Sequence, residues 1–184
     1  TLGIVGESGS GKTTLARFIA GLERADDGHI LIDGNVRPPR TRSDQVQYVF
    51  QDPYSCLDPR ISIVDTVAEP LLAKGLRKAE AVRVAQGLLE EVGIHPALWH
   101  RLPGRLSGGQ RQRVGFARAI APSPKLLIAD EPVAALDSTS RERVLALMGD
   151  MQRRHGTIIA RIETDGSKPA SHVCNAIGDP RAGT

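Results

Sequence analysis

The stretch GESGSGKTT, residues 6–14, has the residue types and the spacing of a phosphate-binding loop. It reads G-x-x-x-x-G-K-S/T, follows the apolar residues 2–5, and precedes a helix-like run from Lys12 to Leu22. Glycines let consecutive backbone N–H groups turn toward one anion, and a helix start adds its own free N–H groups. Lys12 can reach the β- and γ-phosphates of a nucleotide, and the Thr13 hydroxyl can bind Mg²⁺. The predicted nucleotide-binding residues are Gly6, Ser8, Gly9, Ser10, Gly11, Lys12, Thr13 and Thr14.

Two carboxylates, Asp130 and Glu131, directly follow the apolar residues 126–129. In P-loop folds, ligands bind beyond the carboxyl ends of the parallel strands. Asp130 at such a strand end suits Mg²⁺ coordination through water, and Glu131 can polarise the attacking water as a general base. Alone, the pattern also fits a strand followed by a solvated loop, but a P-loop in the same chain favours the catalytic interpretation.

The stretch LSGGQ, residues 106–110, has the features of a second phosphate-binding device. Its glycines allow close backbone approach, Ser107 supplies a hydroxyl, and the helix that follows presents its N-terminus to an anion. Taken alone, an ordinary helix start capped by serine explains the same residues better.

The elements around these motifs alternate between strand and helix patterns. Residues 27–34 are bounded by turn residues and predict a strand in a small antiparallel section, whereas residues 35–45 are polar and Pro-rich and predict a loop. Strands are also predicted at 2–5, 46–50, 126–129 and 157–162, and a helix capped by Asp137 or Ser138 is predicted to about His155.

Residues 60–121 predict a helical subdomain inserted into an α/β core. Ser62 with Asp65 resembles a capping box before a helix over 63–73, which Pro70 is expected to disturb. Residues 77–92 follow the spacing of an amphipathic helix that ends at Gly93, and residues 106–121 continue as a helix after the Ser-Gly-Gly turn.

Composition and charge limit the classes of function. The chain has 184 residues, which suits one domain, and a net charge of +3. The densest basic cluster is Arg111, Arg113 and Arg118, for which a solvated helix face is favoured over a nucleic-acid patch. Six aromatic residues in total also argue against a stacking surface for nucleic acid. Cys56 and Cys174 suggest neither a zinc site nor a disulfide framework.

The order and spacing of five motifs resemble those of the nucleotide-binding domain of an ABC transporter: GESGSGKTT, Gln51, LSGGQRQR, LLIADEP, and ALD at 135–137. The stretch QDPYSCLDPR is most similar to the ATPase subunits of dipeptide, oligopeptide and nickel importers. The resemblance implies an α/β fold with a RecA-like P-loop core, a parallel sheet, a small antiparallel section and the helical subdomain. Residues 1–184 are then one partial domain, with a poorly matching tail at 157–184, and we expect truncation before Thr1.

The resemblance also implies roles for individual residues. Two such domains would pair head to tail around two ATP molecules. Ser107 and Gly109 of one chain would then face the γ-phosphate held by Lys12 and Thr13 of the other. Gln51 is similar to the glutamine that touches Mg²⁺ or the attacking water, Glu131 matches the catalytic base, and Asp137 matches an aspartate at the dimer interface. The implied signature residues are Ser107, Gly108, Gly109 and Gln110, and the implied metal ligands are Thr13, Gln51 and Asp130.

The implied partners are a second ATPase subunit, two transmembrane permease subunits and, indirectly, an extracytoplasmic solute-binding protein; no nucleic acid is expected. No apolar run approaches the roughly 20 residues that span a bilayer. Any membrane role is therefore expected to go through a partner. The resemblance implies a location at the cytoplasmic face of the membrane, reached through the permease, with the helical region after Gln51 as the docking surface. The expected activity is ATP hydrolysis coupled to import of peptides or related small solutes.

The chain departs from the family after Ile162. The family carries a switch histidine just after this strand, and Thr164 lies at that position here. One alternative is therefore a nucleotide-binding module with impaired hydrolysis. A second is a non-transport ABC ATPase acting on DNA or ribosomes, which is disfavoured because Lys12 to Leu106 contains neither a coiled coil nor a zinc module.

Overall fold

The centre of the molecule is a four-stranded parallel sheet with the strand order β1-β6-β5-β4. The computed structural model describes residues 2–24, 27–32, 34–37, 44–50, 57–134 and 136–164. Continuous apolar strands suit a parallel sheet, because helices cover both of its faces. The strands are β1 (Leu2–Gly6), β4 (Val46–Val49), β5 (Leu126–Asp130) and β6 (Ile158–Thr164).

The register of β6 brings the ends of the sequence motifs to one edge of the sheet. Gly6 at the end of β1 pairs with Thr164, and Asp130 at the end of β5 pairs with Ile162. The prediction that this strand stops at Ile162 was wrong, because pairing with β1 extends it through Thr164.

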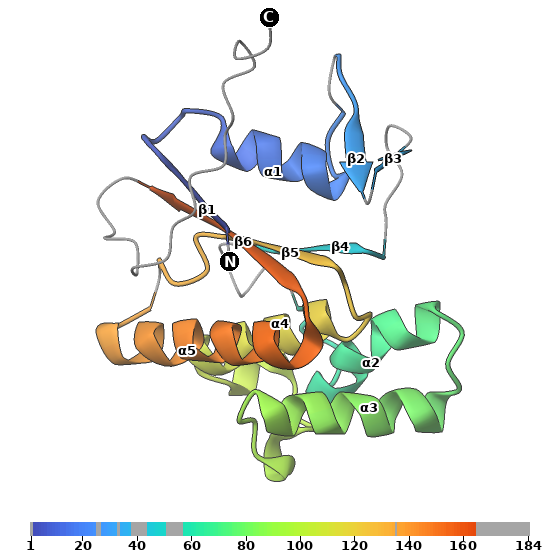
Figure 1. The fold of residues 1–184 in the computed structure, drawn as a ribbon. Helices are drawn as coiled ribbons and strands as arrows, with labels where there is room; N and C mark the ends of the chain where they lie inside the picture. The colour runs from blue at the N-terminus through green and yellow to red at the C-terminus, as the bar shows by residue number, and fades with distance from the viewer. Residues whose placement is uncertain are drawn as a thin grey trace, which may run out of the picture.

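One helix, α1 (Lys12–Ala20), covers one face of the sheet, and the other helices lie on the opposite side (Figure 1). Side chains alternate between the two faces of a strand, and the two cores follow this alternation. Ala16 and Ala20 of α1 pack against the strand residues Val46, Ile128, Ala160 and Ile162. The opposite core contains the neighbouring strand residues Val49, Leu127, Ala129 and Ile159.

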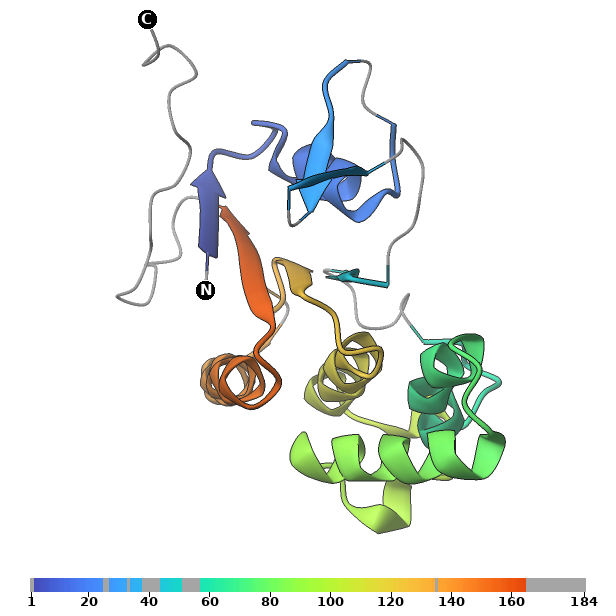
Figure 2. The same cartoon turned by 45° about the vertical axis from the view of Figure 1, so that its right-hand side comes forward.

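The larger core is formed by four helices, and Figure 2 shows them together beneath the sheet. Ser62 caps the first, since its hydroxyl accepts a hydrogen bond from the Asp65 N–H, and Pro70 lies inside it without ending it. Gly93, with φ of 72°, follows the end of the second. None of the described helices is long and apolar enough to cross a membrane. The four are α2 (Ile63–Ala73), α3 (Lys78–Glu91), α4 (Gly108–Ile120) and α5 (Ser138–His155), with 3₁₀ turns at Pro96–Leu98 and Pro103–Arg105.

A two-stranded antiparallel section lies on the α1 side of the molecule (Figure 2). It pairs β2 (Ile30–Ile32) with β3 (Asn35–Arg37) around Gly34, whose φ is 75°. The antiparallel section was predicted, but its second strand lies in residues expected to be loop. That prediction was wrong because the cross-strand partner, not the polar composition, decides whether so short a segment becomes a strand.

The sequence had suggested that the arginines of α4 form a solvated helix face. In the structure they instead contact neighbouring elements. Arg111 is 6% exposed, and its Nη1 donates to the Pro103 carbonyl at 3.2 Å. Arg113 donates to the carbonyls of Val92 and Gly93, and Arg118 forms a 2.8 Å ion pair with Glu69 of α2. The helix is enclosed by α2, α3, α5 and β4, so these charges hold neighbouring elements together.

Candidate nucleotide-binding site

The loop between β1 and α1 leaves the start of the helix without a side-chain cap. Gly9 and Gly11 have φ of 81° and 88°, in the left-handed region that glycine adopts without strain. Gly11 occupies the cap position of α1. A serine or aspartate there would accept a hydrogen bond from a free N–H group of the first turn. An uncapped helix start behind two such glycines is suited to a phosphate.

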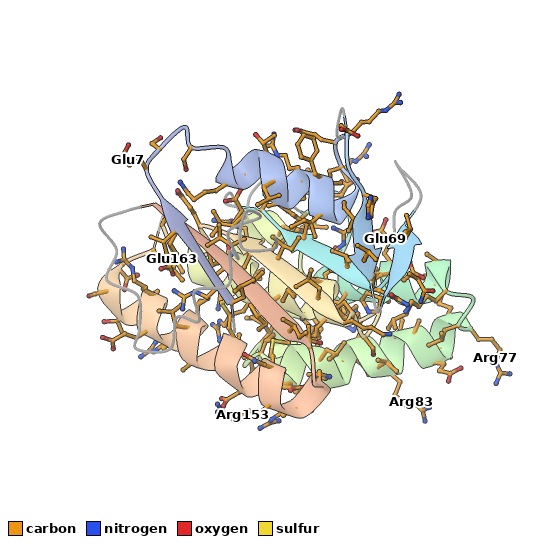
Figure 3. The ribbon with its side chains drawn as sticks, turned by 45° about the horizontal axis from the view of Figure 1, so that its top comes forward. Glu7, Glu69, Arg77, Arg83, Arg153 and Glu163 are labelled. Atoms are coloured by element: carbon orange, nitrogen blue, oxygen red, sulfur yellow. The ribbon has the colours of Figure 1, made fainter. Side chains whose placement is uncertain are left out.

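Lys12 points its ammonium group back into this loop. Its Nζ donates to the carbonyl oxygens of Gly6 at 2.7 Å and Glu7 at 2.6 Å, and lies 3.3 Å from the Ser10 hydroxyl. The lysine charge is thus held in the concave part of the loop, at the end of the sheet where Glu7 is labelled in Figure 3. An incoming phosphate would find a positive charge that is already positioned.

Asp130 connects three elements at the edge of the sheet. The carboxylate is 6% exposed, and its Oδ1 accepts from the Thr13 hydroxyl of α1 at 3.4 Å. Its Oδ2 accepts from the Tyr48 hydroxyl of β4 at 2.6 Å. Burial, followed by the hydrogen bond to Asp130, raises the pKa of Tyr48 well above its ordinary value, so this hydroxyl stays protonated and donates. The structure therefore brings together two of the three predicted metal ligands, Thr13 and Asp130.

Glu131, the predicted general base, adopts φ of 44°, which is uncommon for a residue with a side chain. Its backbone N–H donates to the Ile162 carbonyl at 3.0 Å, and its own carbonyl accepts from the Ala134 N–H at 3.1 Å. These two bonds turn the chain out of β5 at the carboxyl edge of the sheet. Glu131 thus follows immediately after Asp130 at the edge that carries the P-loop.

Two further sequence predictions are only partly covered by the structure. Gln51 lies outside the described residues, and it follows β4 by two positions in the sequence. Thr164, at the position of the family's switch histidine, ends β6 and pairs with Gly6, the first residue of the P-loop. Its backbone is therefore next to the candidate site.

Ser107 and Gln110 of the second motif bond to each other at the start of α4. The Ser107 hydroxyl accepts from the Gln110 N–H at 3.2 Å, and the Gln110 side-chain oxygen accepts from the Ser107 N–H at 2.8 Å. This is a complete capping box, the ordinary explanation that the sequence favoured for the motif alone. Ser107 remains exposed, and α4 belongs to the core opposite α1.

Asp137 caps α5 beside the same motif. Its Oδ1 accepts from the Ser140 N–H at 2.9 Å, and hydrogen bonds with Ser140 lower the pKa of its carboxyl. A side chain added at Gly109 would meet the Ser140 hydroxyl at 3.7 Å. The exposed residues Ser107 and Asp137 thus cap two helices whose starts approach each other at Gly109 and Ser140.

Tyr48 is a residue of the site that sequence reasoning missed. Strand alternation in β4 places Tyr48 on the same face as Val46, toward α1. That alternation was available in the sequence, but the pairing of β4 with β5, which places the hydroxyl beside Asp130, was not.

Comparison with known proteins identifies the family. The model of the ABC transporter family matches residues 1–134 of this chain. The chain belongs to the ABC transporter family. This confirms the resemblance carried by the five motifs, and the α/β fold with its parallel sheet and small antiparallel section agrees with it.

Relatives within the ABC transporter family include ATP-binding proteins named for oligopeptide transport and glutathione import. The chain is 41% identical over 187 residues to the oligopeptide transport ATP-binding protein OppF of Bacillus subtilis (strain 168). It is 44% identical over 173 residues to the glutathione import ATP-binding protein GsiA of Escherichia coli (strain K12). These alignments cover 97% and 90% of this chain. The chain spans 61% of the length of OppF and 28% of the length of GsiA.

A solved ABC structure shares the fold. It is the ATP-binding cassette MJ0796, described as a dimer in a post-hydrolysis state bound to ADP and Pi. The TM-score is 0.74 at 29% sequence identity, and the match covers 88% of this chain and 73% of that chain. The likeness shows that this chain shares the fold of an ATP-binding cassette.

Proposed function

We propose that this chain binds and hydrolyses ATP as the ATPase subunit of an importer for peptides or related small solutes. The observation that carries the proposal is the contact between Thr13 and Asp130, 3.4 Å apart, which joins the P-loop helix to the end of β5 beside Lys12. The relatives that are named for oligopeptide transport and glutathione import support the choice of cargo class.

The oxygen atoms at this edge suit Mg²⁺. Among the described residues, no group of three or more His, Cys, Asp or Glu side chains could hold a metal ion alone. Mg²⁺ bound with a nucleotide does not need such a group, because it uses one or two protein oxygens together with phosphate oxygens and water. Thr13 and Asp130 supply a hydroxyl and a carboxylate, and Gln51 is the further ligand that family resemblance implies. Bound there, the ion would neutralise charge on the β- and γ-phosphates.

The reaction assigns one role to each residue of the edge. Lys12 and the free N–H groups of α1 hold the phosphates. Glu131 accepts a proton from the attacking water while the water oxygen forms a bond to the γ-phosphorus. The bond between the γ-phosphorus and the oxygen that leaves with ADP breaks. The φ of 44° at Glu131 is uncommon for a residue with a side chain, and such strain is often found at residues held for function.

A second copy of this subunit, or a related one, would complete the site. The helices α1 and α4 pack on opposite faces of the sheet (Figure 1), which supports a site completed by a second chain. Head-to-tail pairing would bring Ser107, Gly108, Gly109 and Gln110 of one copy to the nucleotide of the other, with Asp137 at the interface.

The permease would dock on the helical subdomain, for which we propose residues 60–121. A groove of about 400 Å³ lies along the edge strand β4, between α2 and α4, and its lining includes Phe50, Pro70 and Arg118. Gln51 follows this strand in the sequence, which would connect the groove to the nucleotide. The subunit would then act at the cytoplasmic face of the membrane, with specificity supplied by the permease and a solute-binding protein.

ATP binding tests the proposal directly. Lys12→Ala removes the charge from the loop and is expected to weaken ATP binding by at least about ten-fold, since charged hydrogen bonds are among the strongest. Equilibrium titration with a fluorescent ATP analogue measures the affinity. Lys78→Ala, on the exposed start of α3, makes the same substitution away from the loop and is expected to bind like the parent. Equal affinity of Lys12→Ala and the parent for the ATP analogue would contradict the proposal.

A slowly hydrolysing form of the same site is the second candidate. It is favoured by Thr164, which pairs with Gly6 at the place where the family carries its histidine. A hydroxyl or backbone group there cannot take the part of an imidazole in proton transfer. This candidate keeps ATP binding and dimer formation and differs only in the rate of hydrolysis.

A further inference from the structure

We infer that Tyr48 is a positioning residue of the magnesium site: its hydroxyl holds the Asp130 carboxylate so that the opposite oxygen faces Thr13. The inference rests on the proposed function, because Mg²⁺ at Thr13 and Asp130 is part of that proposal. It assigns a task to a tyrosine on the strand that precedes Gln51.

The two oxygens of Asp130 are divided between two elements. Oδ2 accepts the Tyr48 hydroxyl at 2.6 Å, and Oδ1 lies 3.4 Å from the Thr13 hydroxyl. The first contact is short and well within hydrogen-bond range, whereas the second is long. The strong bond therefore sets the rotation of the carboxylate, and the weak one leaves Oδ1 available to a water or an ion.

The backbone holds both partners in fixed positions. Tyr48 pairs with Ile128 in adjacent parallel strands, and Asp130 lies two residues further along β5 on the same face. The tyrosine ring packs with the core of α1, and its centroid lies 4.7 Å from that of Phe50. A rigid aromatic ring on a strand is a more precise support for a ligand than a side chain on a loop.

A purely structural explanation would be that a partly buried hydroxyl needs some acceptor. Many acceptors satisfy that need, including backbone carbonyls, which accept most side-chain hydrogen bonds that are not made to water. Here the acceptor is instead the carboxylate predicted to bind the metal. Groups that hydrogen-bond to a ligand from behind orient it, and their removal typically weakens metal binding or activity.

The test is the Mg²⁺ dependence of ATP binding by the full chain carrying Tyr48→Phe. This variant keeps the ring and loses only the hydroxyl. Binding of a fluorescent ATP analogue is titrated with Mg²⁺, and also measured with EDTA. We expect the Mg²⁺ concentration for half-maximal stimulation to rise about ten-fold, with no change in the affinity measured in EDTA. Lys78→Ala, on the exposed start of α3 and away from Tyr48, is expected to show the Mg²⁺ dependence of the parent.

A double-mutant cycle separates positioning from a general loss of stability. In an Asp130→Ala background, Tyr48→Phe is expected to have no further effect on the Mg²⁺ dependence, because the group it acts through is gone. Tyr48→Met, which also lacks the hydroxyl, is expected to repeat the shift seen with Phe.

Two results would overturn the inference. If the parent binds Mg-ATP and Tyr48→Phe has the same Mg²⁺ dependence, the role inferred for Tyr48 is wrong and the proposed function still stands. An equal shift with and without Asp130 shows that the tyrosine acts elsewhere. A parent that binds no ATP under either condition removes the proposed function and this inference with it.

Discussion

In the proposed reaction, Glu131 and Thr164 are the residues that we expect to have the largest effect on the rate of hydrolysis. Glu131 leaves β5 with φ of 44°, an arrangement that costs on the order of 1–3 kcal/mol for a residue with a side chain. The cost is offset by the hydrogen bond from its N–H to the Ile162 carbonyl, which lies two residues before Thr164. The candidate base and the residue at the histidine position are therefore connected through β6.

Glu131→Gln is expected to reduce ATP hydrolysis at least about 100-fold while ATP binding persists, because an amide cannot accept the proton. Phosphate release by the assembled transporter measures the rate, and Glu80→Gln on exposed α3 is the matched control. Thr164→His is expected to raise hydrolysis, but only where Glu131 is intact. A Glu131→Gln rate equal to that of the parent would contradict the assignment of the base.

The arginines of α4 act at the scale of the helices. Arg113 donates from its Nη1 to the carbonyls of Val92 and Gly93 at 3.1 and 3.0 Å, just beyond α3. Its pKa is lowered, first by burial and then by the nearby charge of Arg143. The helix that begins with the signature motif is thereby fixed to the end of α3, and its orientation depends on a polar contact as well as on the apolar core.

Arg113→Met should lower the free energy of unfolding by about 2 kcal/mol, because two carbonyls lose a charged donor. Urea unfolding of the full chain measures this change, with ATP affinity expected to stay at the parent value. Arg83→Met is the matched control, since Arg83 extends away from α3 into solvent (Figure 3) and its loss should leave stability unchanged. Equal stability of the two variants would mean that Arg113 does not hold α4 to α3.

At the scale of the whole molecule, the sheet separates the P-loop helix α1 from α4, the helix that begins with the proposed signature motif. The P-loop helix packs on one face and the signature helix on the other, each with its own core. We propose that this arrangement serves a site shared by two chains. It is suited to a pair of chains related by a two-fold axis, in which each start of α4 meets the other chain's P-loop.

Ser107→Arg in a Glu131→Gln background is expected to abolish ATP-dependent dimers while each monomer still binds ATP. The added side chain would occupy the space between the signature helix and the partner's nucleotide. Light scattering after gel filtration, with ATP and with ADP, measures the mass. Ala79→Arg adds the same side chain on exposed α3 and should leave the dimer intact. Persistence of the dimer in Ser107→Arg would contradict head-to-tail pairing.

The sequence by itself determined the elements whose signals are local. The glycine and lysine spacing of the P-loop, the caps at Ser62 and Asp137, and Gly93 after α3 all act within one or two turns of chain. Helix bounds predicted from these signals agree with the structure to within about two residues. The same local patterns, taken in order, were enough to indicate the family, which the comparison confirmed.

Only the tertiary structure decided the features that depend on partners distant in sequence. The position of β6 between β1 and β5 extends that strand to Thr164, and a cross-strand partner turns Asn35–Arg37 into a strand. Burial of Arg111 follows from the elements packed around α4, not from its helical spacing. The Tyr48 hydroxyl meets Asp130 for the same reason, because hydrogen bonding between strands joins residues that are 82 positions apart.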